Sequence, residues 1–486
     1  MKVCMFSLNE CNSNFNTVRR LTRTLAAAGH DVRVIAYLTG RVDRYEESDG
    51  ARIFRVTLYP VDPEMLRPVL LLAMLPYKSA LRVCGFIVAL LSRLVRKLPG
   101  LRPAKSPPVI SGAKEGGETG RGGAPASARV VIYNPLSGVY RLFSRLERRI
   151  YWRCYRMARY LLLLLPYIYL AYLFYYWRSF RLARKEPADV YHANDLVTMP
   201  VAWLCSRLTG GKLVYDSHEL WLDRPRLRKR SRLNRFIVHR IESFFIHHTD
   251  ANIIAGESSS KALSERYNIG PPIVIMNVPY YHPFERSTVF RDKLGISAEE
   301  RIILYMGKIS WGRGIESGIQ SLKHLSQVSC VVFGSGLDSY VAELKVFIED
   351  KGLADRVYFF GEVPFDEVTR HAMSADIGLV LHQNIGLNYY YVSPNKLFEC
   401  MAAGLPVVGS NFPDLKKYIE GYNLGVTCDP ESPKDIAEAI DYILSDETRY
   451  NEMRKNALEA AKVFNWENES KKLVALYDGL GQKSNV

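Results

Sequence analysis

The sequence has no Cys-x-x-Cys pair, although eight cysteines are scattered along its 486 residues. This spacing argues against a disulfide framework and against a zinc site, and it is typical of a protein kept in a reducing compartment. Residues 2–7 read as a short strand rather than as a charged region followed by a long apolar one, so we expect no secretory signal peptide. The chain also contains no Asp-x-Asp motif.

Acidic residues are scarce in one region. Residues 65–185 hold 22 Lys and Arg but only three acids, a charge of +19, whereas the whole chain carries +15. The remainder is therefore at −4 (15 − 19), an ordinary balance for a soluble protein. A length of 486 residues predicts two or more domains. The basic excess thus marks one insertion and not the whole protein.

The first part of the chain alternates short apolar strands with helices. The strand–helix–strand pattern within residues 3–37 predicts a right-handed βαβ unit of a parallel sheet, and 52–58 adds a further strand. The loop after the first strand is not glycine-rich, so we expect no phosphate-binding loop there. The same pattern resumes after the insertion, and residues 1–64 and 186–276 are expected to form one domain.

The insertion, residues 65–185, consists of apolar sequence interrupted by basic residues. Its centre, residues 99–128, is rich in Pro, Gly and Ser and predicts a flexible linker. On each side of this linker the basic residues share one broad face when wound at helical pitch. Residues 160–177 then form a run of 18 uncharged residues rich in Leu, Tyr and Phe.

Two interpretations of the insertion compete. The uncharged run just reaches the length of a transmembrane span. A pair of interfacial helices would instead place Arg side chains at the level of the lipid phosphates and aromatic rings among the headgroups. We favour the interfacial or re-entrant hairpin, because both ends of the insertion return to the same sheet. A soluble helical subdomain and a nucleic-acid-binding segment fit less well, since the charge has no counterpart elsewhere and lies on lipophilic helices.

Polar residues follow two predicted strands of the first domain. His192 lies at the end of one strand, and His218 and Glu219 follow the next. The carboxyl ends of parallel strands share one edge of a sheet, where ligands bind. Each residue alone is better explained as a structural polar group with satisfied hydrogen bonds. Their equivalent positions favour a shared functional site.

A second alternating series of strands and helices spans residues 277–460. We predict a second parallel α/β domain that faces the first across a cleft. Lys308 and Arg313 lie in a glycine-spaced loop between a strand and a helix, where two cations suit a diphosphate. The predicted strands are 302–306, 328–333, 357–359 and 377–381.

The stretch 389–410 reads as loop, helix, turn and buried strand in quick succession. We expect Ser393 to cap the helix, Pro394 to occupy its first position and Gly404 to end it in a left-handed conformation. Lys396 places a cation in the first turn, where the helix dipole favours anions. Either an anion such as a diphosphate binds there, or Lys396 simply points into water.

Several motifs in residues 302–426 together resemble the retaining GT-B glycosyltransferases of family 4. In order they are Gly307-Lys308 through Arg313-Gly314, Phe333-Gly-Ser-Gly, Val357-Tyr-Phe-Phe-Gly-Glu-Val-Pro, Ala375-Asp376 and Pro394-Asn-Lys-Leu-Phe-Glu-Cys-Met-Ala-Ala-Gly-Leu-Pro-Val-Val. The N-terminal half resembles the acceptor domain more loosely, through Gly29-His30-Asp-Val, His192-Ala-Asn-Asp and Tyr215-Asp-Ser-His-Glu. Residues 461–486 are similar to the family's final helices, which return to the first domain. The insertion is not covered.

The resemblance implies an α/β GT-B fold of two Rossmann-like domains facing across a cleft, a nucleotide-sugar donor, and neither cofactor nor metal. Carried over, Lys308 and Arg313 hold the diphosphate, Glu399 bonds the ribose, and the backbone around Val363 meets the base. His192 would stand near the transferred sugar. The remaining residues of the implied site are Gly307, Ser393, Asn395 and Lys396 for the donor, and His218, Glu219 and Asn194 on the acceptor side.

Two positions depart from the family pattern. Tyr391 stands where the first acid of a Glu-x7-Glu pair would contact the donor sugar, and Asn194 stands where many relatives carry a second His.

We therefore weigh two functions. The first is sugar transfer, with retention and without metal, from a UDP- or GDP-sugar to a lipid-linked or polysaccharide-precursor acceptor. It would take place at the cytoplasmic face of the cell membrane, with the insertion on anionic lipid and with no nucleic-acid partner. The alternative is a catalytically silent GT-B-like membrane scaffold or regulatory subunit.

Overall fold

The fold is described from a computed structural model, which describes residues 1–8, 16–38, 44–57, 165–224, 231–364 and 367–482. The chain divides into two compact units, Met1–Thr57 with Tyr175–Val486, and Leu58–Phe174. Most of the second unit, including the predicted linker at 99–128, lies outside the described residues. The fold below is that of the first unit.

The first unit includes residues 175–185, which the sequence placed in the insertion. Tyr175, Ser179 and Ala183 are fully buried there. The Tyr175 hydroxyl donates to the carbonyl of Ser7 at 3.3 Å, and the Arg33 guanidinium donates to the carbonyl of Ala183 at 3.2 Å. This stretch is therefore part of the core of the first domain, and the boundary predicted at 185 is wrong by about ten residues.

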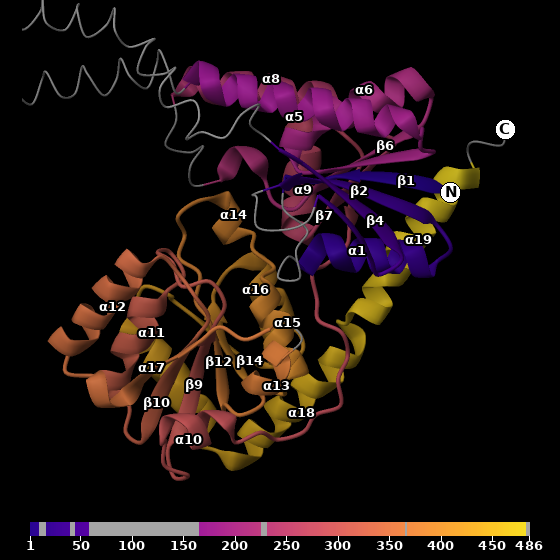
Figure 1. Ribbon diagram of the computed structural model, residues 1–486. Coiled ribbons are helices and arrows are strands. Elements are labelled where there is room, and N and C mark those ends of the chain that lie inside the picture. Colours follow the sequence, from indigo (N-terminus) through magenta and orange to yellow (C-terminus); the bar gives the residue numbers. More distant parts are fainter. Residues whose placement is uncertain (9–15, 39–43, 58–164, 225–230, 365–366, 483–486) are drawn as a thin grey trace, which may run out of the picture. The chain divides into compact units, whose positions relative to one another are not determined.

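The first half of the unit is built on an eight-stranded sheet (Figure 1). All its strands run parallel except β3, an edge strand that the sequence did not predict, which forms an antiparallel hairpin with β4. In spatial order they are β3 (Tyr45–Ser48), β4 (Ala51–Thr57), β2 (Asp31–Leu38), β1 (Lys2–Phe6), β5 (Val190–Asn194), β6 (Lys212–Ser217), β7 (Ala251–Ile254) and β8 (Ile273–Val274).

Helices cover both faces of this sheet, with α6 and α8 on one side and α1 on the other (Figure 1). The predicted apolar face of α1 is confirmed, since Val18, Leu21 and Leu25 are all buried. The helices are α1 (Asn16–Ala27), α5 (Leu165–Lys185), α6 (Met199–Thr209), α8 (Arg232–Ile246) and α9 (Glu257–Tyr267), with single turns η2 (Leu196–Thr198) and η3 (Trp221–Asp223).

The second half is built on a six-stranded, all-parallel sheet, as predicted. The chain leaves β9 in one direction for β10 and later returns to its other side as β12. The carboxyl ends of β9 and β12 therefore flank a topological switch point, where open α/β sheets bind ligands. In spatial order the strands are β11 (Val357–Gly361), β10 (Val328–Phe333), β9 (Arg301–Met306), β12 (Ile377–Val380), β13 (Val407–Ser410) and β14 (Gly425–Cys428).

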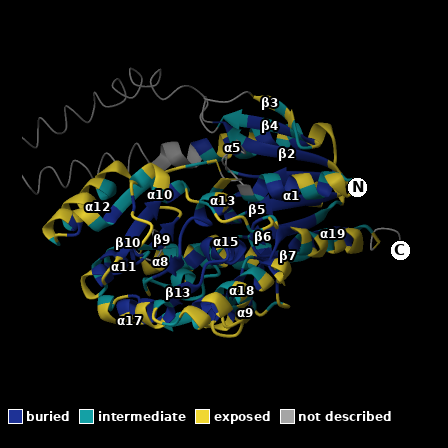
Figure 2. Ribbon diagram, turned by 90° about the horizontal axis from the view of Figure 1, so that it is seen from below, coloured by how far each residue is buried: buried dark blue, intermediate teal, exposed yellow. Residues whose placement is uncertain are grey.

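Most helices of the second half show exposed outer faces, whereas α15 is buried along almost its whole length (Figure 2). Leu397, Phe398 and Met401 form its predicted apolar face and are fully buried. The helices are α10 (Val289–Leu294), α11 (Ile315–Ser321), α12 (Asp338–Asp350), α13 (Val368–Ala372), α14 (Leu387–Tyr390), α15 (Asn395–Ala402), α16 (Pro413–Ile419), α17 (Pro433–Leu444) and α18 (Glu447–Val463), with turns η4 (Leu322–His324) and η5 (Ala354–Arg356).

The last helix, α19 (Trp466–Gln482), returns to the first half and packs against α1. The amide of Trp466 donates to the carbonyl of Pro279 at 2.8 Å, and its indole N–H donates to the hydroxyl of Thr24 at 2.9 Å. The return of the final helix is thus confirmed. It fixes the two halves to each other at the point where the chain first passes between them.

Among the residues that the structure describes, no helix is both long and apolar enough to cross a membrane. The uncharged run at 160–177 ends inside α5, and its first residues lie outside the described ranges.

Substitution of Gly314 can test how tightly the loop after β9 is packed. Its φ is +66°, and a Cβ there would lie 2.2 Å from the carbonyl oxygen of Leu381. Gly314→Ala should therefore lower the free energy of unfolding by about 2 kcal/mol or more, measured by chemical denaturation. Gly479→Ala, in the exposed interior of α19 with open space around it, should instead raise it by about 0.5–1 kcal/mol. Equal effects at the two sites would contradict this account.

Candidate active site

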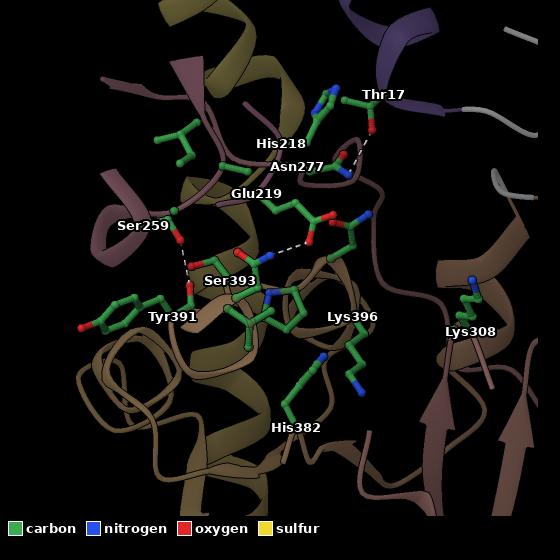
Figure 3. A pocket seen from close by; sticks show the side chains of 18 of the residues that line it. Thr17, His218, Glu219, Ser259, Asn277, Lys308, His382, Tyr391, Ser393 and Lys396 are labelled. Carbon is green, nitrogen blue, oxygen red and sulfur yellow. Dashed lines mark hydrogen bonds between the residues drawn. The ribbon is translucent and has the colours of Figure 1, made fainter. Parts of the chain in front are cut away.

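A cavity of about 540 Å³ lies where the carboxyl edges of the two sheets meet (Figure 3). Both halves of the first unit line it. Of the residues that the sequence singled out, those on its wall are Gly307, Lys308, Arg313, Ser393, Asn395, Lys396, His218, Glu219 and Tyr391. His192, Asn194, Glu399 and Val363 are not on the wall.

The loop after β9 brings two cations to the cavity. Gly307 has a φ of +106°, which turns the chain away from the strand so that Lys308 reaches the wall. The Arg313 guanidinium is held by the Ser310 hydroxyl, which accepts from Nε at 3.1 Å. Gly314, also at positive φ, then stands at the N-cap position of α11. A strand, a turn at positive φ and a helix start therefore place both cations at the switch point.

The start of α15 differs by one residue from the sequence prediction. Pro394, with φ −80° and ψ 143°, occupies the N-cap position, and Asn395 begins the helix. Ser393 is not the cap, because its hydroxyl donates to the carboxylate of Asp414 at 2.9 Å. No side chain caps the helix, so its first backbone N–H groups stay available at the cavity. The predicted left-handed end at Gly404 is confirmed, with φ +63°.

Lys396 is a buried cation without an anionic partner. It is 6% exposed, and its Nζ has no hydrogen-bond partner among the described residues. Nζ lies 4.6 Å from the centre of the Tyr305 ring. Burial, with a smaller contribution from Arg313, lowers the pKa of Lys396 to about 7. The interpretation that Lys396 points into water is therefore wrong.

His382 is a site residue that the sequence analysis missed. It follows β12, lines the cavity beside Lys396 (Figure 3) and is 2% exposed. Its Nδ1 has no hydrogen-bond partner among the described residues. Burial, together with Lys396 and Arg313, holds the pKa of His382 well below its usual value, so the ring is neutral at pH 7. The rule that selected His192 and His218, a His just past a strand end, also applies to His382.

On the other side of the cavity, His218 is oriented by a buried carboxylate. Its Nδ1 lies 3.7 Å from Asp216 Oδ1. Burial lowers the pKa of His218, but Asp216 and Asp195 outweigh that effect, and the pKa is raised overall. Burial raises the pKa of Asp216, but His218 and His192 outweigh it, and the pKa is lowered overall. The cavity therefore meets an imidazole that favours its charged form.

His192 is not placed as the sequence analysis expected. Its ring is fully buried beneath the cavity wall, so it does not face the space where a sugar would sit. Its Nδ1 lies 2.7 Å from the hydroxyl of Tyr477 on α19, and its Nε2 lies 3.5 Å from Asp216 Oδ2. His192 thus supports Asp216, which in turn orients His218.

Two further charged residues, Asp195 and Arg224, line the side of the cavity that the first half forms. The Arg224 guanidinium pairs with Glu219 Oε1 at 2.7 Å and donates to Asp195 Oδ1 at 2.9 Å. Burial raises the pKa of Glu219 despite this pairing. The amide of Asn388, on α14 of the second half, donates to Glu219 Oε2 at 3.0 Å. This hydrogen bond crosses the cavity and links its two sides.

Glu399 is buried behind the wall rather than on it. Its Oε2 accepts from the hydroxyl of Thr369, whereas Oε1 has no partner among the described residues. Burial raises the pKa of Glu399 to about 7, with Thr369 and Arg20 opposing the shift.

The other two residues off the wall have structural contacts. Val363 packs partly buried against the core. The Asn194 amide donates to the carbonyl of Phe6 at 2.9 Å, which ties β5 to β1 and keeps the side chain away from the cavity.

In the described part of the chain, no group of three or more His, Cys, Asp or Glu side chains is placed to bind a metal ion. Two more polar wall residues that sequence reasoning missed are Thr17 and Asn277. The Asn277 amide donates to the Thr17 hydroxyl at 3.2 Å (Figure 3). Thr17 lies at the start of α1 and Asn277 lies where the chain first passes between the halves, and no motif marked either residue.

Two family models match the chain. One, described as "Glycosyl transferase 4-like domain", matches residues 16–280, and the other, "Glycosyl transferases group 1", matches residues 287–460.

Two relatives illustrate the sequence similarity. An uncharacterized glycosyltransferase of Methanocaldococcus jannaschii is 28% identical over 40% of this chain and 49% of its own length. A D-inositol 3-phosphate glycosyltransferase of Xylanimonas cellulosilytica is 25% identical over 44% of this chain and 51% of its own length. The chain thus spans about half the length of these curated relatives.

Solved structures share the fold. Sucrose-phosphate synthase of Thermosynechococcus elongatus superposes with a TM-score of 0.66 at 16% identity, covering 99% of this chain and 100% of the other. Anabaena HepE in complex with UDP and glucose superposes with a TM-score of 0.61 at 14% identity, covering 99% and 100%. The fold is therefore GT-B, with two Rossmann-like domains of parallel sheet.

The burial of Lys396 predicts that its positive charge lowers the free energy of unfolding of the protein. Its pKa is about 7 when folded against 10.5 when exposed, so the unfolded chain binds more protons between those values and stability rises with pH there. Lys396→Met should raise the free energy of unfolding at pH 7 by about 1 kcal/mol, measured by urea denaturation. The gain should shrink toward pH 10. Lys434→Met, at a side chain that is 74% exposed, should change little, and a destabilised Lys396→Met would contradict the prediction.

Proposed function

Because the chain belongs to the glycosyl transferase 4-like family, we propose that it transfers a sugar from a nucleotide-sugar donor to an acceptor held across the cavity. The observation that carries this proposal is the buried Lys396 Nζ, which has no hydrogen-bond partner among the described residues and lies on the same cavity wall as Arg313 and Lys308. Buried charges in proteins are normally paired, so an anionic ligand is the missing partner.

The donor end of the cavity suits a diphosphate. Three cations line this part of the wall, Lys308 and Arg313 from the loop after β9 and Lys396 from the first turn of α15. The uncapped N-terminus of α15 adds backbone donors and the positive end of the helix dipole. Among the described residues of the second half, none on the cavity wall carries a carboxylate. We propose a UDP- or GDP-sugar as the donor, and the solved HepE structure with UDP and glucose supports UDP as a first probe.

The chemistry follows from where negative charge develops. As the bond between the sugar and the diphosphate breaks, its electron pair remains on the diphosphate. Lys396, Arg313 and Lys308 are already in place to stabilise that charge, which lowers the barrier without reorganisation. His382, neutral and with a free Nδ1, can bond a hydroxyl of the donor. We propose that this stabilisation needs no metal and that the anomeric configuration is retained.

The first half of the cavity would hold the acceptor. Thr17, His218 and Asn277 offer hydrogen bonds there, and the Glu219–Arg224 pair borders them. His218 acts as a positioning residue whose charged form is favoured by Asp216. The relatives' names refer to D-inositol 3-phosphate and sucrose phosphate, but the acceptor proposed here is lipid-linked or a polysaccharide precursor.

This acceptor is proposed because of the basic insertion. Residues 65–174, without the stretch 175–185 that belongs to the first domain, hold 18 Lys and Arg and three acids, a charge of +15 that anionic lipid at the cytoplasmic face of the membrane would complement.

Tyr391 favours the alternative function, a silent GT-B-like scaffold. It lies on the cavity wall where the family's sugar-binding acid would stand, and it brings no carboxylate. Its carbonyl accepts from the hydroxyl of Ser259 at 3.3 Å, so its backbone has a structural contact with the first half.

Turnover separates the enzyme from the scaffold. Wild-type protein should hydrolyse or transfer from UDP-glucose or GDP-mannose, and Arg313→Ala should reduce kcat about 100-fold or more because a preorganised cation is lost. Lys434→Ala, on the exposed face of α17, is the matched control and should behave as wild type. No turnover with any nucleotide-sugar, together with no binding of UDP or GDP, would establish the scaffold.

Donor binding should also depend on pH. The protonated form of Lys396 binds the diphosphate, and its pKa in the free protein is about 7. The Kd for UDP-glucose should therefore rise by up to about 50-fold from pH 7 to pH 9, measured by calorimetry. Lys396→Arg should flatten this profile, because Arg stays charged throughout. A flat wild-type profile would show that Lys396 does not meet the diphosphate.

A further inference from the structure

Helix α8 presents an apolar face to solvent. Five large apolar side chains on it are exposed, led by Leu233 at 67% and Phe236 at 62%. The other three are Ile237, Ile241 and Phe244. When the helix is wound at 100° per residue, these five fall within an arc of about 140°. They form one continuous stripe, and part of it lines a shallow apolar hollow.

The inward face of α8 is mixed, since both Ile246 and the charged Glu242 are buried there, which departs from the usual apolar inward face of a surface helix. Glu242 lies opposite the stripe and is fully buried. Its carboxylate accepts from the hydroxyl of Tyr215 at 3.0 Å and from that of Tyr267 at 2.7 Å. These contacts fix which side of α8 faces the sheet. The helix cannot rotate to bury its apolar stripe without breaking them.

The stripe continues onto the neighbouring helix α6. The Trp203 ring of α6 packs edge-on against Phe244 of α8, with the ring centres 5.5 Å apart. Leu208 of α6 is 64% exposed, and Leu204 is 38% exposed. A contiguous apolar surface of this kind on a soluble domain marks an interaction site.

The exposed charged side chains of α6 and α8 are all basic. Arg240 lies in the middle of the arc and is exposed, Arg232 is exposed at the start of the helix, and Arg207 is exposed on α6. The single acid of α8 is the buried Glu242. Aromatic and aliphatic side chains interleaved with arginine match the headgroup region of an anionic bilayer.

We propose that the outer face of α8, continued by Leu204 and Leu208 of α6, is a docking surface for an anionic lipid membrane. This surface is separate from the donor site, and the proposal does not rest on the proposed function. It is, however, linked to the cavity. Asp223 pairs with Arg235 of α8 at 4.0 Å, and the next residue, Arg224, is on the acceptor side of the cavity wall. A lipid-borne acceptor would thus start close to the side of the cavity that receives it.

Site-specific photo-crosslinking identifies what covers the stripe. The full-length protein carrying p-benzoylphenylalanine at position 236 is irradiated with phosphatidylglycerol vesicles or with phosphatidylcholine vesicles. Lipid adducts at position 236 are expected with the anionic vesicles. The matched position 346, on the exposed face of α12, should give none. Crosslinks to a peptide from residues 58–164, or to a second copy of the chain, would show another occupant and overturn the proposal.

Vesicle sedimentation measures how much the stripe contributes. The double variant Phe236→Asp with Phe244→Asp should partition onto phosphatidylglycerol vesicles at least about tenfold less than wild type. Val346→Asp should partition as wild type does. A double variant that changes partition by less than about twofold overturns the docking surface. Binding of UDP by the same variant should be unchanged, so failure of the docking surface stays distinguishable from failure of the donor site.

Discussion

The constraint on which this structure depends is an unpaired positive charge in a buried place. Lys396 stands in the first turn of α15, a helix whose other residues build the core of the second domain. Exposing the Lys396 side chain to water would require α15 to move out of that core. Removing its proton would leave the site without this positive charge. The protein instead keeps Lys396 beside Arg313 and depresses its pKa. This charge is the basis for the anionic donor proposed above, and Lys308 and the uncapped start of α15 lie on the same cavity wall.

A second requirement is that the two halves that line the cavity keep a fixed position relative to each other. The returning helix α19 meets this requirement far from the donor site, because Trp466 bonds both the linker at Pro279 and the first domain at Thr24. Tyr477 of the same helix reaches His192, which supports Asp216 and through it His218. The Asn388–Glu219 hydrogen bond links the halves directly at the cavity. The side of the cavity that the first half forms is thus organised by residues from both halves and from the last helix.

The outer face of α8 and the basic insertion point to the same environment by different arguments. The insertion does so through composition, since its charge is unbalanced by acids. Helix α8 does so through its orientation, because the buried Glu242 and its two tyrosine partners hold the apolar stripe outward. Helix α8 buries the polar Glu242 and leaves Phe and Ile side chains in water, so folding alone gives it little hydrophobic stabilisation. A lipid surface would recover that apolar contact.

The sequence by itself determined the two α/β halves, most strand and helix positions of the second half, and the cations of the donor site. Hydrophobic periodicity, glycine-spaced turns and a lysine in the first turn of a helix are patterns among neighbouring residues. They can therefore be recognised in the sequence without knowledge of the fold. The tertiary structure decided the rest. It placed His192 and Glu399 behind the wall, added His382 and Arg224 to it, moved residues 175–185 into the core and turned the apolar face of α8 to solvent. These outcomes depend on how segments that are distant in the sequence pack against one another. That packing decides which side chains are buried, and it is not encoded in a local sequence pattern.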